Sequence, residues 1–357
     1  MITHEKYIPF LKWRQSEYQA LFKLTPDVKE AIVPYIIIPP IEYDFEERKL
    51  KKTIEEHITP MPNRLKTKWG RLAILDFHSS LEDKFMPCGN SVIKYVFNKT
   101  IEMGHLLIPA YSFDKSNFYL QELSKIINKD TGIALRLFFE DLNKPDINKQ
   151  ISDLFNFIKV DYSQVDLIID LQTPDKFEPY KLFSNLIHNN VSKINNLNSF
   201  RSFVISAHSL NLREISQPDT HVTRHEWQIY PDLCLKFKDK PPAFGDYTIE
   251  NIDFGEPMDM RKITPAAKLI YTLPQHWRIL KGRAFRGNET QMTTFCQIIS
   301  TSPNYKGIRF SDGDKRIKET ADGTNNTGNL GVWKQVAINH HMTKVVRQLS
   351  SHHAPSI

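Results

Sequence analysis

The chain of 357 residues has only three cysteines and no long uninterrupted apolar segment. Cys88, Cys234 and Cys296 show none of the paired CxxC spacing of zinc or redox motifs, so we expect three buried thiols and no metal-ligand cluster built on cysteine. The longest apolar stretch, residues 31–41, is 11 residues long and contains three prolines. A membrane-spanning helix needs about 20 apolar residues. We therefore expect no membrane association.

A secretory signal and the common nucleotide-binding motifs are also missing. The first ten residues contain Glu5 and Lys6 and no apolar core, which predicts a cytoplasmic protein. No Walker A or GxGxxG pattern occurs. Glycine is scarce, with 13 residues against 22 phenylalanines, and 40% of the chain is hydrophobic. This composition excludes a low-complexity chain and predicts a globular fold with a sizeable core.

Short β-rich runs alternate with segments of helical periodicity along the first two thirds of the chain. The predicted strands are residues 7–11, 32–38, 72–76, 106–111, 133–138, 165–171, 202–206, and 232–237 or 243–248. The predicted helices are residues 17–22, 45–58, 91–103, 116–128, 147–160 and 180–190. Eight strands within about 250 residues predict an α/β fold of the (β/α)8 TIM-barrel type. An open α/β sheet with an antiparallel edge is the alternative.

The charge divides the chain into two regions. Residues 258–357 carry 15 Lys and Arg against six Asp and Glu, a net charge of +9, which leaves −3 for residues 1–257. We predict a barrel over 1–257 and a basic C-terminal extension over 258–357, packed on the barrel. The extension is expected to contain a β-hairpin (268–283), a helix (291–301), a long loop (302–331) and a final helix (332–349) capped by Asn329 or Thr327.

The C-terminal region of the chain resembles a known protein family. The run Phe310-Ser-Asp-Gly-Asp, the Gly/Asn-rich segment 322–331, Trp333 and residues 337–349 resemble the closing signature of the beta family proteins of bacteria and mobile elements. Weaker similarities are found at residues 7–12, 39–40, 244–247, 277 and 283–287. The chain differs from the family pattern by Ala337 in place of a glycine and by Lys334 in place of an arginine. Lysine acts as a point charge and lacks the bidentate geometry of arginine.

The resemblance implies no defined activity and no catalytic set. Members of the family tend to occur in genomic neighbourhoods associated with defence against phages and mobile DNA. The resemblance therefore implies a role in such a defence system, with a protein partner encoded in the same locus as one expectation.

Candidate catalytic residues follow the predicted barrel strands. Ligand-handling residues of a βα barrel lie at the carboxyl ends of its strands. Asp76, Asp170 and Asp246 fall at such ends, and converging carboxylates can hold a divalent cation such as Mg²⁺ or divide acid and base roles. His208 is a candidate general base, although no Gly-x-Ser-x-Gly motif frames the serines beside it. The alternative is that these residues only cap loops or stay solvated.

Candidate anion-binding residues lie in the basic extension. Four cations fall within nine residues at the end of the predicted hairpin and just after it, namely Arg278, Lys281, Arg283 and Arg286. They are interleaved with Trp277 and Phe285, and cations alternating with aromatics can grip a nucleic-acid backbone and stack on its bases. On the final helix, His340, Lys344 and Arg347 form a polar and cationic stripe that can contact phosphate oxygens. A helix that packs with its polar groups satisfied internally is the alternative.

Three functions remain open from the sequence. The first is a defence component that binds nucleic acid or a partner protein through its basic C-terminal region. The second is a metal-dependent phosphoester hydrolase that works at the barrel mouth. The third is a catalytically silent adaptor whose barrel is only a scaffold, since barrels host many chemistries and some have none.

Overall fold

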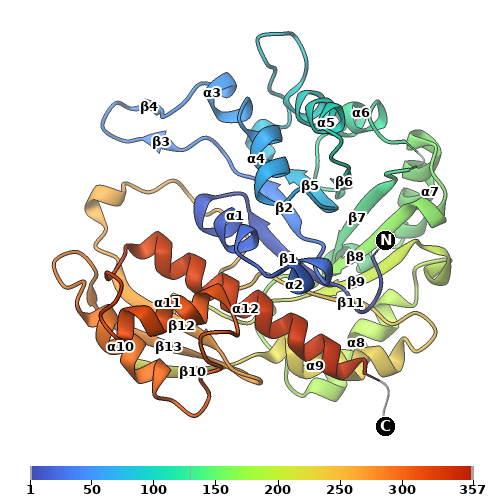
Figure 1. Ribbon diagram of the computed structural model, residues 1–357. Helices are drawn as coiled ribbons and strands as arrows, with labels where there is room; N and C mark the ends of the chain where they lie inside the picture. Colours follow the sequence, from blue (N-terminus) through green and yellow to red (C-terminus); the bar gives the residue numbers. More distant parts are fainter. Residues whose placement is uncertain (1, 129, 355–357) are drawn as a thin grey trace. The chain divides into compact units, whose positions relative to one another are not determined.

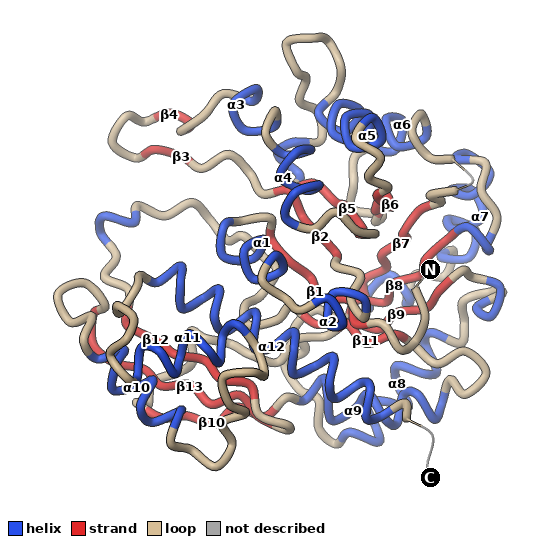
Figure 2. Tube along the Cα trace, viewed as in Figure 1, coloured by secondary structure: helices blue, strands red, loops and turns tan. Residues whose placement is uncertain are grey.

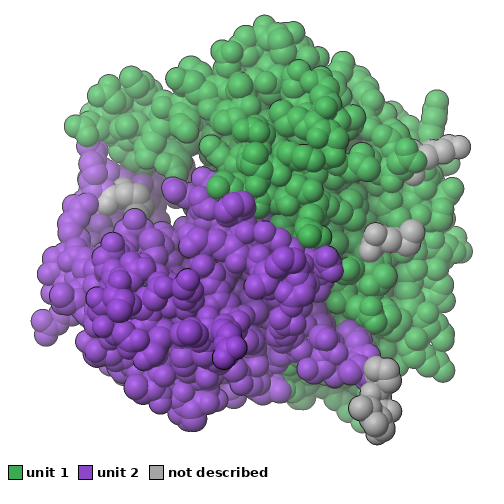
Figure 3. Space-filling model, viewed as in Figure 1, with its two compact units in different colours: residues 1–12, 33–208, 226–246 green, residues 13–32, 209–225, 247–357 purple. Residues whose placement is uncertain are grey.

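The computed structural model describes residues 2–128 and 130–354, which form two compact units (Figure 3). Unit 1 consists of Met1–Lys12, Val33–His208 and Glu226–Asp246. Unit 2 consists of Trp13–Ile32, Ser209–His225 and Tyr247–Ile357. The division thus differs from the predicted single cut after residue 257. Unit 2 takes in two earlier segments because each of them pairs or packs with C-terminal elements.

Unit 1 is a closed barrel of eight parallel strands, as the sequence predicted (Figure 1). The order around the barrel is β1-β11-β9-β8-β7-β6-β5-β2, and β1 closes it by pairing with both β11 and β2. This closure excludes the open sheet. The strands are β1 Tyr7–Lys12, β2 Tyr35–Ile38, β5 Ala73–Phe77, β6 Leu107–Tyr111, β7 Ile133–Phe138, β8 Val165–Asp170, β9 Ser202–Ser206 and β11 Ala243–Asp246.

The helices of unit 1 follow the strands along the chain, as repeated βα units require. They are α3 Ile54–Ile58, α4 Met61–Lys68, α5 Val92–Glu102, α6 Asn117–Ser124, α7 Ile147–Ile158, α8 Tyr180–Val191 and α9 His225–Lys236, whose first residue belongs to unit 2. Serine caps start two of them: the Oγ of Ser91 accepts from Lys94 N at 3.2 Å and the Oγ of Ser116 from Tyr119 N at 3.2 Å. Such caps satisfy backbone N–H groups that the first turn leaves open.

Unit 2 is built on an antiparallel sheet of order β10-β13-β12, formed by β10 Asp219–Thr223, β12 Ala266–Thr272 and β13 His276–Ala284. Figure 2 shows these strands beside α10 Gln291–Ser300 and α11 Asp312–Ala321. The long helix α12 Leu330–His352 contacts β12 and α11, and also α1 Gln15–Phe22 and α2 Pro26–Glu30. The Nδ2 of Asn339 donates to Ala20 O at 2.9 Å, which fixes α1 on α12.

Several sequence predictions need correction. Residues 45–58 are not one helix, because Asp44 Oδ1 accepts from Glu46 N at 2.9 Å and from Glu47 N at 3.1 Å and turns the chain between β3 Tyr43–Asp44 and β4 Lys49–Leu50. The alternative strand at 232–237 is part of α9, and the strand at 243–248 is β11.

The predicted loop 302–331 contains α11, which begins after Ser311, whose Oγ accepts from Asp314 N at 3.0 Å. The sequence did not predict this helix because Gly313, a residue unfavourable in helices, lies in its first turn. Glycine is required at this position because a Cβ would come within 2.5 Å of Val336 O of α12. The hairpin of β12 and β13 is confirmed, as are helix α10 and the Asn329 cap of α12, where Oδ1 accepts from Val332 N at 3.0 Å.

Two further expectations concern cysteine and membranes. Cys296 is buried as expected, whereas Cys234 is half-buried and Cys88 is exposed. Within residues 2–128 and 130–354, no helix has the length and apolar character needed to cross a bilayer.

Candidate functional site

The interior of the barrel holds charged residues near the carboxyl ends of its strands. The Arg136 guanidinium of β7 lies 5.4 Å from the ring centres of Phe10 in β1 and Tyr35 in β2. Because β7 does not neighbour β1 or β2 in the barrel, these contacts cross its interior. Arg136 Nε donates to Asp170 Oδ2 at 2.8 Å, and a second guanidinium N–H donates to the same oxygen. Asp170 is completely buried, so this charge pair is a buried one.

Asp76 forms a second buried charge pair. Its Oδ1 lies 2.8 Å from Lys115 Nζ, and its Oδ2 accepts from the Tyr35 hydroxyl at 2.8 Å. Burial raises the pKa of Asp76, but the charges of Lys115 and Arg136 lower it by more than burial raises it. The net shift of the Asp76 pKa is therefore downward. Asp76 is therefore an ionised carboxylate at neutral pH. Tyr35 and Lys115 are the donors that it holds in place.

The four predicted catalytic residues do not converge. Asp76 and Asp170 face the barrel interior, but Asp246 faces away from it. Its neighbour Gly245 points inward, since a Cβ there would meet Phe10 and Ser206 at 3.3 and 3.1 Å, and side chains alternate along a strand. The Asp246 carboxylate instead accepts from the Tyr7 hydroxyl at 2.5 Å. A site that combines all three carboxylates is thus not formed.

Ser206 is the last residue of β9, and His208 lies two residues after it. His208 is completely buried, and its backbone N donates to Gln172 O at 2.8 Å. Ser206 is paired in register with Asp170 and is also completely buried. Among the described residues the Ser206 Oγ has no hydrogen-bond partner. A buried hydroxyl without a partner is costly, and it lies beside the Arg136–Asp170 pair.

The predicted divalent cation finds no preformed ligand set in the described parts of the chain, where no group of three or more His, Cys, Asp or Glu side chains could hold a metal ion. Asp76 and Asp170 each have a cationic nitrogen of Lys115 or Arg136 at 2.8 Å. These ammonium and guanidinium groups occupy the carboxylate oxygens that a metal would need. Arg136 and Lys115 can polarise an anionic group that binds beside them.

The four cations predicted at the hairpin differ in how open they are to an external anion. Arg278 forms a bidentate pair with Asp219, with N–O distances of 3.0 and 2.7 Å. Trp277 and Phe285 are buried, at 0% and 8% exposure, so the prediction that they stack on bases is wrong. Phe285 belongs to the buried apolar cluster of unit 2, and Trp277 stacks on His341 of α12 with 6.2 Å between the ring centres. Arg283 and Arg286 are exposed.

A pair of like charges lies on the same sheet. Lys281 is directly opposite Lys268 in the β12–β13 register, and like charges in this position destabilise a sheet. Burial lowers the pKa of Lys268, and the charge of Lys281 lowers it further. Lys281 Nζ donates to Ile215 O at 2.5 Å. We call Lys268, Lys281, Arg283 and Arg286 the basic strip.

His340 is not available to an external anion, since it is 1% exposed. Its Nδ1 lies 2.8 Å from Asp314 Oδ2 and its Nε2 lies 3.0 Å from Thr272 O. Asp314 also accepts from the Tyr271 hydroxyl at 2.8 Å, and His340 lowers the pKa of Asp314 against the effect of burial. The contact between His340 and Asp314 is a structural link between α11 and α12.

The two remaining helix cations behave differently from each other. Arg347 is exposed and pairs with Asp27 of α2 at 2.5 Å. Lys344 is only 9% exposed. Burial lowers the pKa of Lys344 to about 8, and the charges of Lys306 and Arg224 add to this effect. Lys344 is thus a nearly buried lysine whose charged neighbours are cations.

Sequence reasoning missed Arg136, Lys115, Arg224 and Lys306. Only Arg136 left a signal, because it is a single charge within the apolar run 133–138 and points into the barrel. Lys115 and Lys306 lie in connecting segments, and Arg224 lies just after β10. No periodicity marks them.

The Beta protein family matches residues 7–347, which is nearly the whole chain. No curated protein matches the sequence.

Proposed function

The chain therefore belongs to the Beta protein family, and we propose that it is a cytoplasmic component of a bacterial defence system against phages and mobile DNA that binds nucleic-acid phosphates through the basic strip of unit 2. The observation that carries the proposal is the opposition of Lys268 and Lys281 in the sheet, with the exposed Arg283 following on β13. An anionic ligand would relieve the repulsion between the two lysines.

Two further features support phosphate binding at this place. The net charge of residues 258–357 is +9, which attracts polyanions over a distance of about one Debye length. Arg283 lies near the end of β13 and Arg286 lies in the turn that leads into α10, whose N-terminal N–H groups favour negative charge. Since Trp277 and Phe285 are buried, the contact would rest on charge and would be independent of base sequence.

The test measures binding of labelled single- and double-stranded DNA and RNA by fluorescence anisotropy across a salt series. Arg283→Ala combined with Arg286→Ala should weaken binding and reduce the slope of log affinity against log salt by about 1.8 on duplex DNA, because two phosphate contacts are lost. The matched control is Lys315→Ala with Lys318→Ala, which removes the same charge from surface ion pairs of α11 in the same unit.

Two outcomes would refute the proposal. One is an unchanged affinity and slope in the Arg283/Arg286 variant. The other is an equal loss in the control, which would reduce the effect to net charge. If the wild type binds no nucleic acid at low salt and a protein co-purifies with it, the adaptor function is favoured, with the partner encoded in the same locus.

A second candidate is chemistry at the barrel mouth, and the Ser206 hydroxyl without a partner beside the Arg136–Asp170 pair favours it. Phosphoester hydrolysis at this place would use Lys115 and Arg136, held by Asp76 and Asp170, to bind the phosphate, because these cations already occupy the carboxylate oxygens that Mg²⁺ would need. Asp246 would take no part, because it faces away from the interior. Turnover of nucleotides, cyclic nucleotides and nucleic acid should be measured with and without Mg²⁺. Asp170→Asn should abolish any turnover and Asp246→Asn should preserve it; the reverse pattern would exclude this site.

A further inference from the structure

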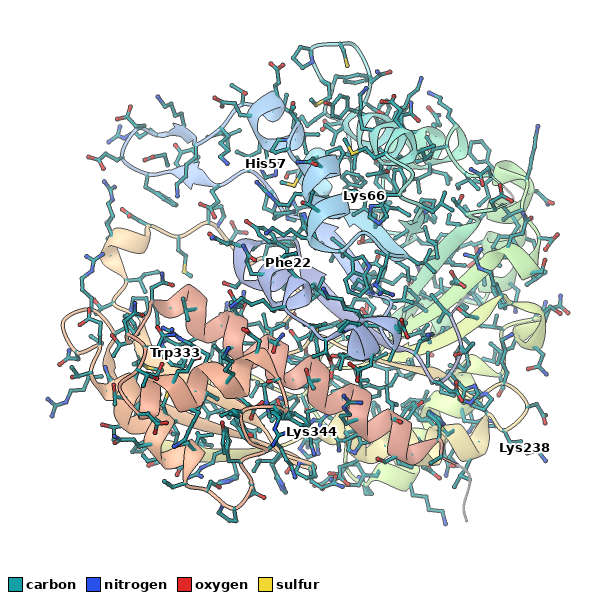
Figure 4. The ribbon with its side chains drawn as sticks, in the orientation of Figure 1. Phe22, His57, Lys66, Lys238, Trp333 and Lys344 are labelled. Atoms are coloured by element: carbon teal, nitrogen blue, oxygen red, sulfur yellow. The ribbon has the colours of Figure 1, made fainter. Side chains whose placement is uncertain are left out.

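Two histidines lie side by side on the antiparallel sheet of unit 2. His221 is in β10 and His276 begins β13, and their ring centres are 6.5 Å apart with the ring planes at 80°. In the part of the chain that the structure describes, neither ring makes a hydrogen bond or an ion pair. Lys344 of α12, which Figure 4 labels, is only 9% exposed, whereas both histidine side chains are exposed. The two imidazoles are therefore open to a ligand from the solvent.

The register of the sheet places both histidines on one face. His221 is directly opposite Arg278, and Thr223 is directly opposite His276. Residues two apart on a strand point to the same face, so His221 and His276 are diagonal neighbours across the β10–β13 ladder. The backbone of the ladder sets their spacing before any ligand binds, which lowers the entropic cost of bringing two ligand groups together.

The cation beside this pair is already neutralised. Arg278 donates to both oxygens of Asp219, with N–O distances of 3.0 and 2.7 Å. The hydrogen bond from Arg278 lowers the pKa of Asp219 below its usual value, so Asp219 is ionised at neutral pH. The Asp219 carboxylate offsets the charge of Arg278, and a metal cation at the two histidines would therefore meet little net repulsion from this arginine.

We propose that His221 and His276 bind a divalent transition-metal ion of the zinc type, with water completing its coordination. Imidazole nitrogen is a common zinc ligand. At a Zn–N distance of about 2.1 Å, two imidazoles on one tetrahedral ion have ring centres about 5 Å apart. The two exposed rings would thus have to approach each other by roughly 1 Å from the observed 6.5 Å. Two protein ligands in place of the four of a structural zinc site make the binding weak and exchangeable.

A metal ion at this place would join two segments that are far apart in the chain. β10 lies in the connection between β9 and α9, and β13 belongs to the C-terminal hairpin. Binding would tie that connection to the hairpin, so the amides of β10 should open less often when the ion is bound. The site shares no residue with the basic strip, so it stands or falls independently of the proposed function.

The experiment measures metal binding to the full chain, prepared without a histidine tag, by isothermal titration calorimetry at neutral pH. Zinc chloride and magnesium chloride are titrated separately. We expect saturable binding of zinc and none of magnesium, which prefers oxygen ligands. In hydrogen exchange, zinc should slow the exchange of the β10 amides in the wild type and leave it unchanged in a variant that lacks both histidines.

The variants separate this site from adventitious binding to other histidines. His221→Gln and His276→Gln should each weaken zinc binding by about tenfold or more, since even the loss of a group behind a metal ligand has an effect of about this size. The matched control is His352→Gln with His353→Gln, which removes another pair of neighbouring imidazoles, 4.8 Å apart at the end of α12, and should leave zinc binding unchanged.

Three results would overturn the proposal. One is the absence of saturable zinc binding to the wild type, which would reduce the two histidines to an edge-to-face ring contact. Another is zinc binding by both single variants as tight as that of the wild type. The third is an equal loss in the His352/His353 control, which would show that the zinc is an adventitious ion only.

Discussion

Replacement of Lys344 by methionine should stabilise the protein in the absence of ligand. Methionine retains the length of the lysine stem and removes the ammonium, which burial and the charges of Lys306 and Arg224 disfavour. The pKa of Lys344 falls from 10.5 to about 8. At about 1.36 kcal/mol per pKa unit, the fully protonated folded state is less stable by up to about 3 kcal/mol, and partial access of water reduces this to about 1–2 kcal/mol.

The lowered pKa of Lys344 determines how the free energy of unfolding changes with pH. Between the folded pKa of about 8 and the unfolded value of 10.5, the unfolded chain binds more protons at Lys344 than the folded chain does. The stability of the wild type therefore rises with pH across this interval. The variant lacks this contribution, so its advantage is complete below about pH 8 and disappears as the pH approaches 10.5.

Urea unfolding of both proteins, followed by tryptophan fluorescence in phosphate-free buffer at several pH values, measures this difference. Taking the difference between wild type and variant cancels the titration of the other lysines. The reasoning is refuted if Lys344→Met lowers the free energy of unfolding at pH 7, or if the difference between the two proteins does not change with pH. Either result would mean that Lys344 has a counterion in the folded protein.

Lys334→Met, on the same helix, should lower the free energy of unfolding, because it leaves Glu17, which is 4% exposed, without its cation. The expected loss in urea unfolding at pH 7 is about 3 kcal/mol. Equal effects of the two lysine substitutions would contradict the contrast between the sites. Asp314→Asn should weaken the acid sensitivity of unit 2, because His340 and the hydroxyl donors hold the pKa of Asp314 below its usual value against the effect of burial. That contribution to stability is present above about pH 4 and is lost on acidification, so thermal unfolding of the variant should change less than that of the wild type between about pH 5 and about pH 2.

The barrel could be predicted from the sequence because its strands are buried on both faces. Runs such as Tyr35–Ile38 and Ile133–Phe138 are apolar or nearly so, and the spacing of the strands leaves room for one helix between them. The strand β10 escaped notice because Asp219–Thr223 is polar and only partly buried. It exists because it pairs with β13, a partner more than fifty residues away in the chain.

For the candidate catalytic residues, the sequence predicted the position along each strand but not the direction of each side chain. Position in the chain correctly placed Asp76 and Asp170 near the carboxyl ends of their strands. It could not say which way Asp246 points, since a shift of one residue moves a side chain to the other face of a strand. Gly245 faces inward, where a Cβ would lie 3.1 Å from Ser206 and 3.3 Å from Phe10, and Asp246 therefore faces outward to Tyr7.

The two lysines of α12 make the same point for charge. In the sequence, Lys334 and Lys344 are equivalent members of a basic region. In the fold, Lys334 meets carboxylates from residues 17 and 250, and Lys344 meets cations from residues 224 and 306. A net charge of +9 therefore does not by itself identify a binding site, because internal ion pairs such as Lys334–Glu250 and Arg347–Asp27 neutralise part of it. The contacts of each cation decide whether it stays open to an anion, as the paired Arg278 and the exposed Arg283 show on the same strand.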